Sequence, residues 1–300
     1  MNSPITQDMI VTVGTNGDYQ NINDALAYVS DFYPIYKKGG INREIKLLSG
    51  FVMAEQILVS GLNLGGVKIT AESEITVDAS FLTTEFHGFY PLFGVDNGGT
   101  LPTIHATFNY VGTSAVNNKH GILAFGAGSS ANISGGLKNV HGDAIFAYRT
   151  ASIDASFADL SGAKEYGAYA LRAATIDVGG ATVTNAGVAG AYAIGASSIN
   201  AGSANVSNAG QFGLYASETG LINGASAIAD SCGYTGIYSV RNSLLCAHGA
   251  IIRNQTVGGA CVVCIGGSFV EAFSLITYGS TVPILNIPAN TILADGIISQ

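Results

Sequence analysis

The chain has 300 residues, of which 48% are hydrophobic and only 11% are charged, with 40 glycines and no tryptophan. Few charges and many apolar residues exclude a disordered chain, and no apolar run reaches the roughly 18–20 residues of a membrane span. The net charge of −8, with only 12 Lys and Arg, argues against nucleic acid or an acidic membrane as a partner.

The first predicted element is an amphipathic helix close to the N-terminus. Asn21 can cap it, and the apolar residues from Ile22 to Phe32 fall on one helical face ahead of Pro34. Such a helix suits the open end of a stack of strands, because uncovered strand edges aggregate. Residues 1–40 are therefore predicted to hold an N-terminal strand and a capping helix.

Residues 41–120 are predicted to form irregular first rungs that carry an aromatic insertion. Short strands are expected at 45–48, 57–59, 67–69 and 75–77. The insertion, residues 81–111, is rich in Phe and Tyr and includes Glu85, His87 and Asp96, which are weak catalytic candidates. Long loops on rigid scaffolds commonly carry function. The rings could instead plug a widened start of the rod.

Residues 121–276 contain the strongest signal, a short word that returns every 23 residues. The word is Gly or Ala, an apolar residue, an aromatic residue and then Ala, with some variation. Its copies begin at Gly121, Ala144, Gly167, Gly190, Gly213, Gly236 and Gly259. Each unit holds three short patches of alternating apolar residues between Gly, Ser, Thr and Asn, which predicts three strands and leaves no room for a helix.

Such units must stack on one another, because a single three-strand unit cannot bury its apolar side alone. Parallel strands are connected with a right-handed crossover in nearly all proteins. The predicted fold is therefore all-β, a right-handed parallel β-helix with three strands per 23-residue rung and an N-terminal capping helix. The leucine-rich horseshoe, the main alternative for this period, needs regularly spaced Leu, which is scarce here.

The first strand of each rung is apolar at both alternate positions, which in a sheet means that both faces are covered. One face is the rod's own core, and the other needs a partner or is an exposed binding stripe. No charged residue stands between residues 178 and 217. We therefore predict that identical rods pack side by side. The alternatives are tyrosines that point inward, or an aromatic stripe that binds sugars. The predicted interface comprises Phe146, Tyr169, Leu171, Tyr192, Ile194, Tyr215 and Tyr238.

Candidate acids on the regular rungs are Asp154 and Asp177, which stacking places one rung apart. Arg149 and Arg172 precede them by five residues, which favours a ladder of Arg–Asp surface pairs over a catalytic acid pair. Asparagines at repeated positions are expected to form side-chain ladders in the turns. No nucleophile elbow, phosphate loop or dinucleotide fingerprint occurs in the sequence.

The four cysteines lie late in the chain. Cys261 and Cys264 have the separation of half a zinc site, but they stand in an apolar run and no second pair follows. We therefore interpret these residues, with Cys232 and Cys246, as small reduced thiols of the core type. No metal ion and no cofactor is predicted.

The last residues, 277–300, are predicted to form a cap or a segment that crosses to a neighbouring subunit. Pro283 and Pro288 are expected to stop the rung pattern there.

Two stretches resemble known proteins. The run Gly17-Asp-Tyr-Gln-Asn-Ile-Asn-Asp-Ala-Leu resembles the opening of pectate-lyase-like β-helix proteins. The segment Gly50-Phe-Val-Met-Ala-Glu-Gln-Ile-Leu-Val and the rungs with Gly-x-Tyr-Ala resemble bacteriophage and prophage tail spike or tail fibre proteins. The resemblance covers roughly residues 10–275.

The resemblance implies a parallel homotrimer in the virion tail, in contact with phage tail or baseplate proteins, that recognises a host cell-surface polysaccharide. Many relatives also cleave that glycan, so a polysaccharide depolymerase, either a glycoside hydrolase or a lyase, is an alternative. A non-catalytic structural rod or adhesin is another. The family's catalytic carboxylates follow no common motif, and no rung of this sequence clusters the three or four acids of a calcium-dependent lyase, so the sequence leaves catalysis open.

Overall fold

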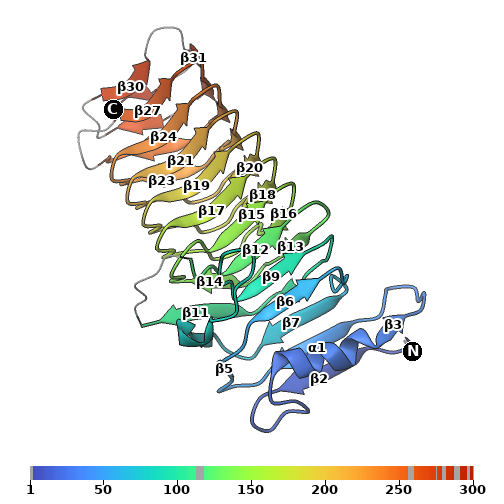
Figure 1. The fold of residues 1–300 in the computed structure, drawn as a ribbon. Helices are drawn as coiled ribbons and strands as arrows, with labels where there is room; N and C mark the ends of the chain where they lie inside the picture. Colours follow the sequence, from blue (N-terminus) through green and yellow to red (C-terminus); the bar gives the residue numbers. More distant parts are fainter. Residues whose placement is uncertain are drawn as a thin grey trace.

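The computed structural model describes residues 3–112, 118–255, 260–274, 276–278, 282–286, 291–295 and 298–299. In these residues, parallel strands coil into a right-handed β-solenoid of about ten turns. Figure 1 shows the turns stacked along one axis, with α1 and the first strands at one end. The predicted fold class is confirmed. Within the same residues, no helix is long and apolar enough to cross a membrane.

The N-terminal end is capped as predicted, although the helix is shorter than expected. Helix α1 (Ile22–Ser30) follows Asn21, whose side chain accepts a 2.8 Å hydrogen bond from the backbone N–H of Asp24. The carboxylate of Glu55 accepts from the backbone N–H groups of Ile22 and Asn23, and a negative charge there stabilises a helix N-terminus. The apolar face of α1 is buried against β2 (Met9–Val13) and β4 (Arg43–Leu47).

The prediction that the helical face extends to Phe32 is wrong. The backbone N–H of Asp31 donates to carbonyl groups of the last turn and ends the helix. Pro34 favours an extended residue before it. The segment β3 (Phe32–Pro34) is accordingly a strand, and it pairs with β1 (Ser3–Ile5).

The irregular first turns contain strands at all four places where the sequence predicts them. They are β4, β5 (Val52–Met53), β6 (Ile57–Ser60), β7 (Val67–Ala71), β8 (Ile75–Asp78), β9 (Phe93–Asp96), β10 (Thr103–Ile104) and β11 (Thr107–Val111). A short 3₁₀ helix, η1 (Ala79–Phe81), begins the segment that leads from β8 to β9.

The regular turns build two long parallel sheets. The first sheet has ten strands, namely β6, β9, β12 (Ile122–Phe125), β15 (Ile145–Tyr148), β17 (Tyr166–Leu171), β19 (Ala189–Ile194), β21 (Phe212–Ser217), β24 (Thr235–Val240), β27 (Ala260–Ile265) and β30 (Val282–Asn286). The second sheet has eight, namely β13 (Ser130–Asn132), β16 (Ser152–Asp154), β18 (Thr175–Asp177), β20 (Ser198–Asn200), β22 (Leu221–Asn223), β25 (Leu244–Cys246), β28 (Phe269–Phe273) and β31 (Thr291–Asp295). Register partners are 23 residues apart from β12 to β24, as Tyr169 and Tyr192 are, which confirms the repeat there. From β24 to β27 the step is 25 residues, as between Ile237 and Val262, so the predicted last copy, which begins at Gly259 outside the described residues, does not keep the 23-residue register.

The third strand of each unit is reduced to one residue in the middle of the rod. Thr182 forms only isolated β-bridges, to Asp159 in the turn before and to Asn205 in the turn after. The backbone N–H of Thr182 donates to the carbonyl oxygen of Ala158, and the N–H of Val183 donates to that of Asn205. Backbone hydrogen bonds therefore still join successive turns on this face, but the turns on both sides of Thr182 leave no room for a longer strand. Full strands occur on this face at β14 (Gly136–Lys138), β23 (Ile228–Asp230), β26 (Ile251–Arg253), β29 (Ile276–Tyr278) and β32 (Ile298–Ser299).

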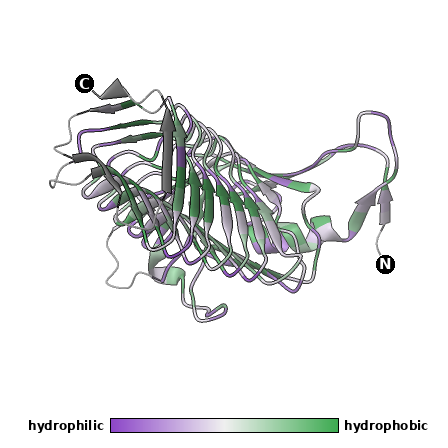
Figure 2. Cartoon of the chain, turned by 90° about the horizontal axis from the view of Figure 1, so that it is seen from above, coloured by the Kyte–Doolittle hydropathy of each residue, from purple (hydrophilic) through white to green (hydrophobic). Residues whose placement is uncertain are grey.

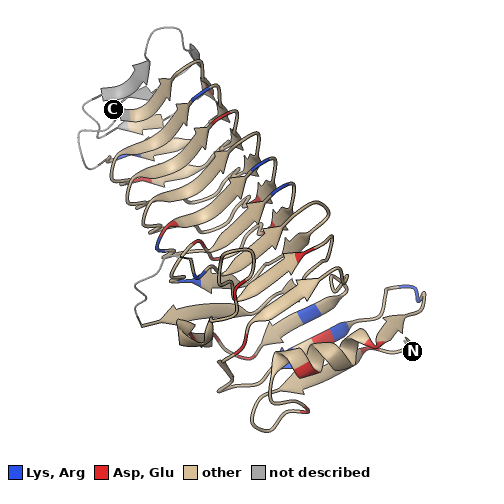
Figure 3. Ribbon diagram, viewed as in Figure 1, with Lys and Arg blue, Asp and Glu red and all other residues tan. Residues whose placement is uncertain are grey.

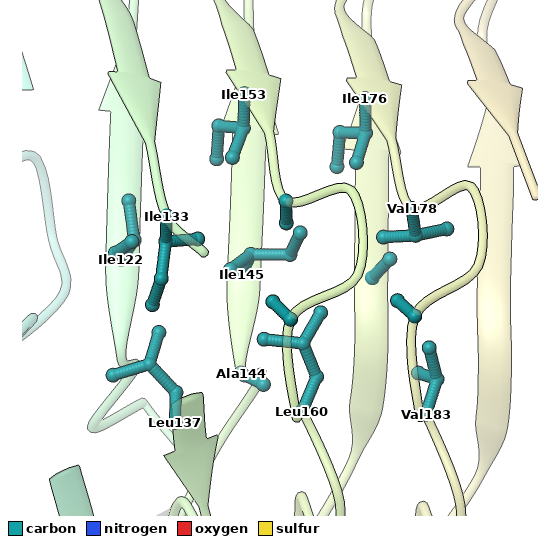
Figure 4. Packing of buried hydrophobic residues seen from close by; sticks show 14 of the residues in the cluster. Ile122, Ile133, Leu137, Ala144, Ile145, Ile153, Leu160, Ile176, Val178 and Val183 are labelled. Carbon is teal, nitrogen blue, oxygen red and sulfur yellow. The ribbon is translucent and has the colours of Figure 1, made fainter. Parts of the chain in front are cut away.

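The core runs along the axis of the solenoid. Apolar residues of each turn point inward and stack on their counterparts in the next turn, as Ile153 does on Ile176 and Leu160 does on Val183 (Figure 4). Complete burial of such a side chain contributes about 1.5–3 kcal/mol. Figure 2 shows the hydrophobic residues concentrated on the strands and the hydrophilic residues on the turns.

Close stacking explains the glycine that opens most copies of the repeated word. A Cβ at Gly190 would lie 2.6 Å from the Cβ of Val206 and 2.9 Å from the carbonyl oxygen of Gly213 in the next turn. A side chain at Gly190 would overlap these atoms, which favours glycine at the start of the word; one copy begins with Ala144 instead.

The strands continue past Pro283, where the sequence predicts that the rungs stop. Strands β30, β31 and β32 pair in parallel with β27, β28 and β29. Pro283 is tolerated inside β30 because the register partners there are Val282 and Ile284, on either side of it. The described part of residues 277–300 therefore adds strands to the same three faces of the solenoid.

Candidate functional site

The outward face of the first sheet carries a stack of aromatic rings, which we call the aromatic ladder. Its centroid separations are 4.7, 5.2, 4.2 and 5.2 Å from one ring to the next. The inward positions of the same strands hold small or aliphatic residues such as Ala168, which is fully buried. The alternative with tyrosines inside is therefore wrong. The ladder consists of Phe146, Tyr169, Tyr192, Tyr215 and Tyr238.

Stacking covers much of the ring surface that a partner would otherwise meet. Tyr192 is only 8% exposed in the single chain, and burial raises the pKa of the Tyr169 and Tyr192 hydroxyls above the usual value. Leu171 and Ile194 lie on the same outward face and are half-buried. The ladder therefore offers ring edges and hydroxyl groups, flanked by aliphatic side chains. Figure 3 shows no charged residue on β19 or β21 in this region.

The ladder ends at a cavity of about 500 Å³, within the roughly 300–1,000 Å³ of small-molecule sites. His120 and Asp143 are 23 residues apart and stand two residues before β12 and β15, and Glu165 stands directly before β17. The repeat therefore brings the three side chains to neighbouring turns on one edge of the sheet. The cavity is lined by Phe89, Asn118, His120, Asp143, Phe146, Glu165, Tyr169 and Leu171.

His120 and Asp143 are both 2% exposed. Burial lowers the pKa of His120 to about 3, and burial together with the charge of Glu165 raises the pKa of Asp143 well above its usual value. Burial thus favours the uncharged form of both groups, and the Oδ2 of Asp143 lies 3.3 Å from Nδ1 of His120.

The hydrogen bonds at this pair define the tautomer of the imidazole. The backbone N–H of Asp143 donates to Nδ1 of His120 at 3.0 Å, so the proton of the ring is on Nε2. That Nε2 is buried and has no hydrogen-bond partner, and the same holds for Oδ1 of Asn118. Two residues lining the cavity therefore each hold an unsatisfied polar atom, at a cost of about 1–3 kcal/mol each.

The aromatic insertion contributes rings both to the lining of this cavity and to the core. Phe93 and Phe108 are fully buried and pack against each other at 5.1 Å. Phe89 instead lies outside the sheet, 5.0 Å from the His120 ring and 5.4 Å from the Phe146 ring.

Two of the predicted catalytic candidates in the insertion meet each other. Nε2 of His87 lies 2.8 Å from Oδ2 of Asp96, and its ring stacks on Phe125 at 3.7 Å. Asp96 is 8% exposed, and its Oδ1 is buried without a partner. Glu85 is exposed. None of the three is among the residues that line the cavity at the end of the ladder.

Asp154 and Asp177 lie in a different groove, of about 570 Å³, on the second sheet. Their Oδ1 atoms accept backbone hydrogen bonds from residues two positions later, at 3.0 Å from Ser156 and 2.8 Å from Gly179. Both carboxylates thus close turns, and no aromatic residue lines the groove. The predicted asparagine ladder is confirmed, because Asn200 donates to Asp177 and Asn223 donates to Asn200, each at 3.0 Å.

The predicted Arg–Asp ladder is wrong. Among the described residues, no ion pair joins Arg149 or Arg172 to an aspartate. Both arginines stand at turns with positive φ, 54° and 58°, and extend toward the first sheet. The guanidinium of Arg149 lies 5.2 Å from the Phe125 and Tyr148 rings, and that of Arg172 lies 5.2 Å from Tyr148.

Three of the four cysteines are buried, as predicted for thiols of the core type. Cys261 and Cys264 face the core, where Sγ of Cys264 donates to the carbonyl of Ser268. Cys246 differs, since it is half-buried at the end of β25.

His120, Asp143 and Glu165 are not among the site residues predicted from the sequence. His120 and Asp143 each stand directly before the repeated word, where later units have Tyr166, Ala189 and Phe212. This change of residue class in one column of the repeat is the signal that would have found them.

The fold and the site together define a right-handed parallel β-solenoid with an outward aromatic ladder that ends at a polar cavity. This architecture is compatible with tail spike proteins and with other polysaccharide-binding proteins. No protein-family model and no curated protein matches the chain.

Proposed function

We propose that the chain recognises a cell-surface polysaccharide, as part of a homotrimeric phage tail spike or tail fibre. The observation that carries the proposal is the cavity where Phe89, Phe146 and Tyr169 lie beside the buried acid of Asp143 and the carboxylate of Glu165. A sugar ring has an apolar side and a rim of hydroxyl groups, which matches aromatic edges next to polar side chains.

The unsatisfied atoms of the cavity favour a ligand with hydroxyl groups. The Nε2–H of His120 can donate to such a ligand, and Oδ1 of Asn118 can accept from it. A hydroxyl group can both accept and donate, so neighbouring hydroxyls of one sugar would satisfy this mixed set. The regular ladder beyond the cavity would then follow a polymer from one repeat to the next.

Binding is tested with purified capsular and lipopolysaccharide glycans in an array, followed by titration of the glycan that binds. We expect Phe89→Ala and Glu165→Gln to weaken binding at least tenfold. Asp154→Asn, in the groove of the second sheet, is the matched control and should bind as the unaltered protein does. Loss of binding in Asp154→Asn alone, or no binding to any glycan, would overturn the proposal.

Cleavage of the same glycan is the second candidate function, and Asp143 is the observation that favours it. Burial raises the pKa of Asp143, which suits an acid that protonates a leaving oxygen, and Glu165 can act as the second carboxylate. New reducing ends after incubation would show hydrolysis. Asp143→Asn should abolish them while binding persists; unchanged cleavage by Asp143→Asn would exclude this role.

The homotrimer is proposed from the apolar character of the outward strand face. Light scattering should give a mass of about 92 kDa, three times the 30.6 kDa of one chain. A mass of one chain at micromolar concentration would remove the trimer but leave glycan binding to be judged by the array.

A further inference from the structure

A second cluster of reactive side chains lies far along the rod from the cavity. Cys246, His248 and Glu271 each place one ligand atom within 4.8 Å of the others, on the outer side of the second sheet. Nε2 of His248 is 3.6 Å from Oε1 of Glu271. None of the three contributes to the aromatic ladder or to the cavity at its end.

The cluster arises where the repeat of the second sheet changes. In two earlier turns, Asn200 and Asn223 accept hydrogen bonds from the backbone N–H groups of Gly202 and Ala225, two positions later. In the next turn, a cysteine, Cys246, takes the place of the asparagine, and His248 takes the place of the small residue.

The following turn supplies the third side chain. Strand β28 pairs with β25, and Glu271 is the register partner of Cys246. Because side chains of register partners lie on the same face of a parallel sheet, the carboxylate stands beside the thiol. Two turns of the solenoid therefore provide one sulfur, one nitrogen and one oxygen ligand.

The ring of His248 is held by packing, but its Nε2 has no hydrogen-bond partner among the described residues. Its ring packs against Phe273 at 4.9 Å, and its Nε2 is buried without a hydrogen-bond partner. The side chains of His248 and Glu271 as a whole are 41% and 39% exposed, so water can reach the open side of the cluster. An imidazole nitrogen that faces a thiol and a carboxylate without a hydrogen bond is suited to a metal ion.

We propose that Cys246, His248 and Glu271 bind a divalent transition-metal ion of the zinc class. Zn²⁺ is coordinated at about 2.0–2.3 Å by these three ligand types, which places ligand atoms about 3.3–3.6 Å apart in a tetrahedron. The observed separation of 3.6 Å between Nε2 of His248 and Oε1 of Glu271 meets this requirement. The other ligand-atom separations are at most 4.8 Å, and small rotations of the half-exposed side chains shorten them. The thiolate and carboxylate charges balance the ion, and water takes the fourth position.

The donor set selects the class of metal. Ca²⁺ and Mg²⁺ require several oxygen ligands, whereas a thiolate with an imidazole favours zinc, cobalt or copper. The bound ion would join two neighbouring turns near the C-terminal end of the rod. Metal binding there should therefore raise the stability of these turns.

The test uses the full chain, ZnCl₂ or CoCl₂, and two kinds of measurement. After incubation and gel filtration we expect about one Zn²⁺ per chain by elemental analysis. Co²⁺ should give a thiolate-to-metal charge-transfer band. Cys246→Ser and Glu271→Gln should each lower metal affinity at least about 100-fold, since losing even an outer partner costs 10–100-fold. Asn223→Ser, in the same column one turn earlier, is the control and should bind fully.

A second measurement does not depend on the folding of a variant. Cys246 is the half-exposed cysteine among the four, so a thiol reagent should label it first in the native protein, and Zn²⁺ should slow that labelling at least tenfold. No retained zinc, a charge-transfer band that survives in Cys246→Ser, or labelling that Zn²⁺ does not slow would each overturn the proposal.

Discussion

Substitution of Asp143 by Asn should stabilise the protein, and the gain should grow as the pH rises. In the native state burial keeps Asp143 protonated above the pH at which an unfolded chain releases that proton. Folding therefore takes up a proton, and this uptake costs more free energy at each higher pH. Asparagine has nearly the same shape and carries no charge in either state, so the cost disappears.

The magnitude follows from linkage. One proton bound by the native state alone lowers the free energy of unfolding by up to about 1.4 kcal/mol per pH unit. For Asp143 this fall begins near pH 4 and continues until the raised native pKa is passed. The difference between Asp143→Asn and the unaltered protein should therefore be nearly constant below pH 4 and should increase steadily above it.

His120 contributes a slope of the opposite sign. Its pKa falls from 6.5 in the unfolded chain to about 3 in the native state, so the unfolded chain alone binds this proton between those values. Stability then rises with pH, by about 5 kcal/mol over the whole interval. In the unaltered protein the slopes of Asp143 and His120 oppose each other between about pH 4 and 6.5. In Asp143→Asn, the rise of stability with pH that His120 causes is no longer opposed by Asp143.

Urea unfolding of both proteins at several pH values between about 4 and 8 measures these slopes. The difference between the two curves isolates Asp143, because every other titrating group is common to both proteins. A difference that stays constant over this range would show that Asp143 is ionised in the native state. A difference that falls with rising pH would contradict the burial argument altogether.

The remaining predictions concern the rungs and their outer face. Gly190→Ala should lower the free energy of unfolding by about 1–3 kcal/mol, because its Cβ would lie 2.6 Å from the Val206 side chain of the same turn and 2.9 Å from the Gly213 carbonyl oxygen of the next. Gly202→Ala, with no atom closer than 3.3 Å, should cost clearly less in the same urea titration, and equal losses would contradict the explanation. Asn200→Ala should cost about 1–2 kcal/mol, since it removes a turn hydrogen bond and two ladder bonds, and an unchanged midpoint would show that the ladder adds nothing. Tyr192→Asp combined with Tyr215→Asp should dissociate or aggregate the predicted oligomer in light scattering, whereas an unchanged mass would show that the ladder does not face a partner.

The period of the sequence was sufficient to predict most of the fold. A 23-residue repeat with apolar residues at fixed places determines which residues become register partners, and the pairing of Tyr169 with Tyr192 follows from it. The capping helix followed from Asn21 and the apolar face after it. The end of that helix was mispredicted, because Phe32 fits a helical face as well as it fits a strand.

The third strand was overpredicted for a related reason. An alternating patch such as the one around Thr182 indicates which side chains point inward, and that indication was correct. It does not indicate how many residues continue in an extended conformation, because the length of the strand depends on turns on either side.

The candidate site could be located only coarsely from the sequence, and electrostatics explains why. In a parallel solenoid, equal positions of successive turns lie about 4.8 Å apart. Two carboxylates at that distance repel each other by about 1 kcal/mol in water and by about 3 kcal/mol near a protein surface. Asparagines can repeat in a column because each amide donates to the side chain of the preceding turn. Asp154 and Asp177 do repeat in one column, and each accepts a backbone hydrogen bond in its own turn. Asp143 occurs once in its column, so a search for repeated residues does not find it.

On such a chain, a column in which the residue class changes brings unlike ionisable groups together. His120 beside Asp143 is one such place near the start of the regular turns, and Cys246 beside Glu271 is another near their end. The turns between them carry no charged side chain from residue 178 to residue 217. Changes within a column, rather than the repeat itself, are therefore the positions at which substitutions should alter binding or catalysis without altering the fold.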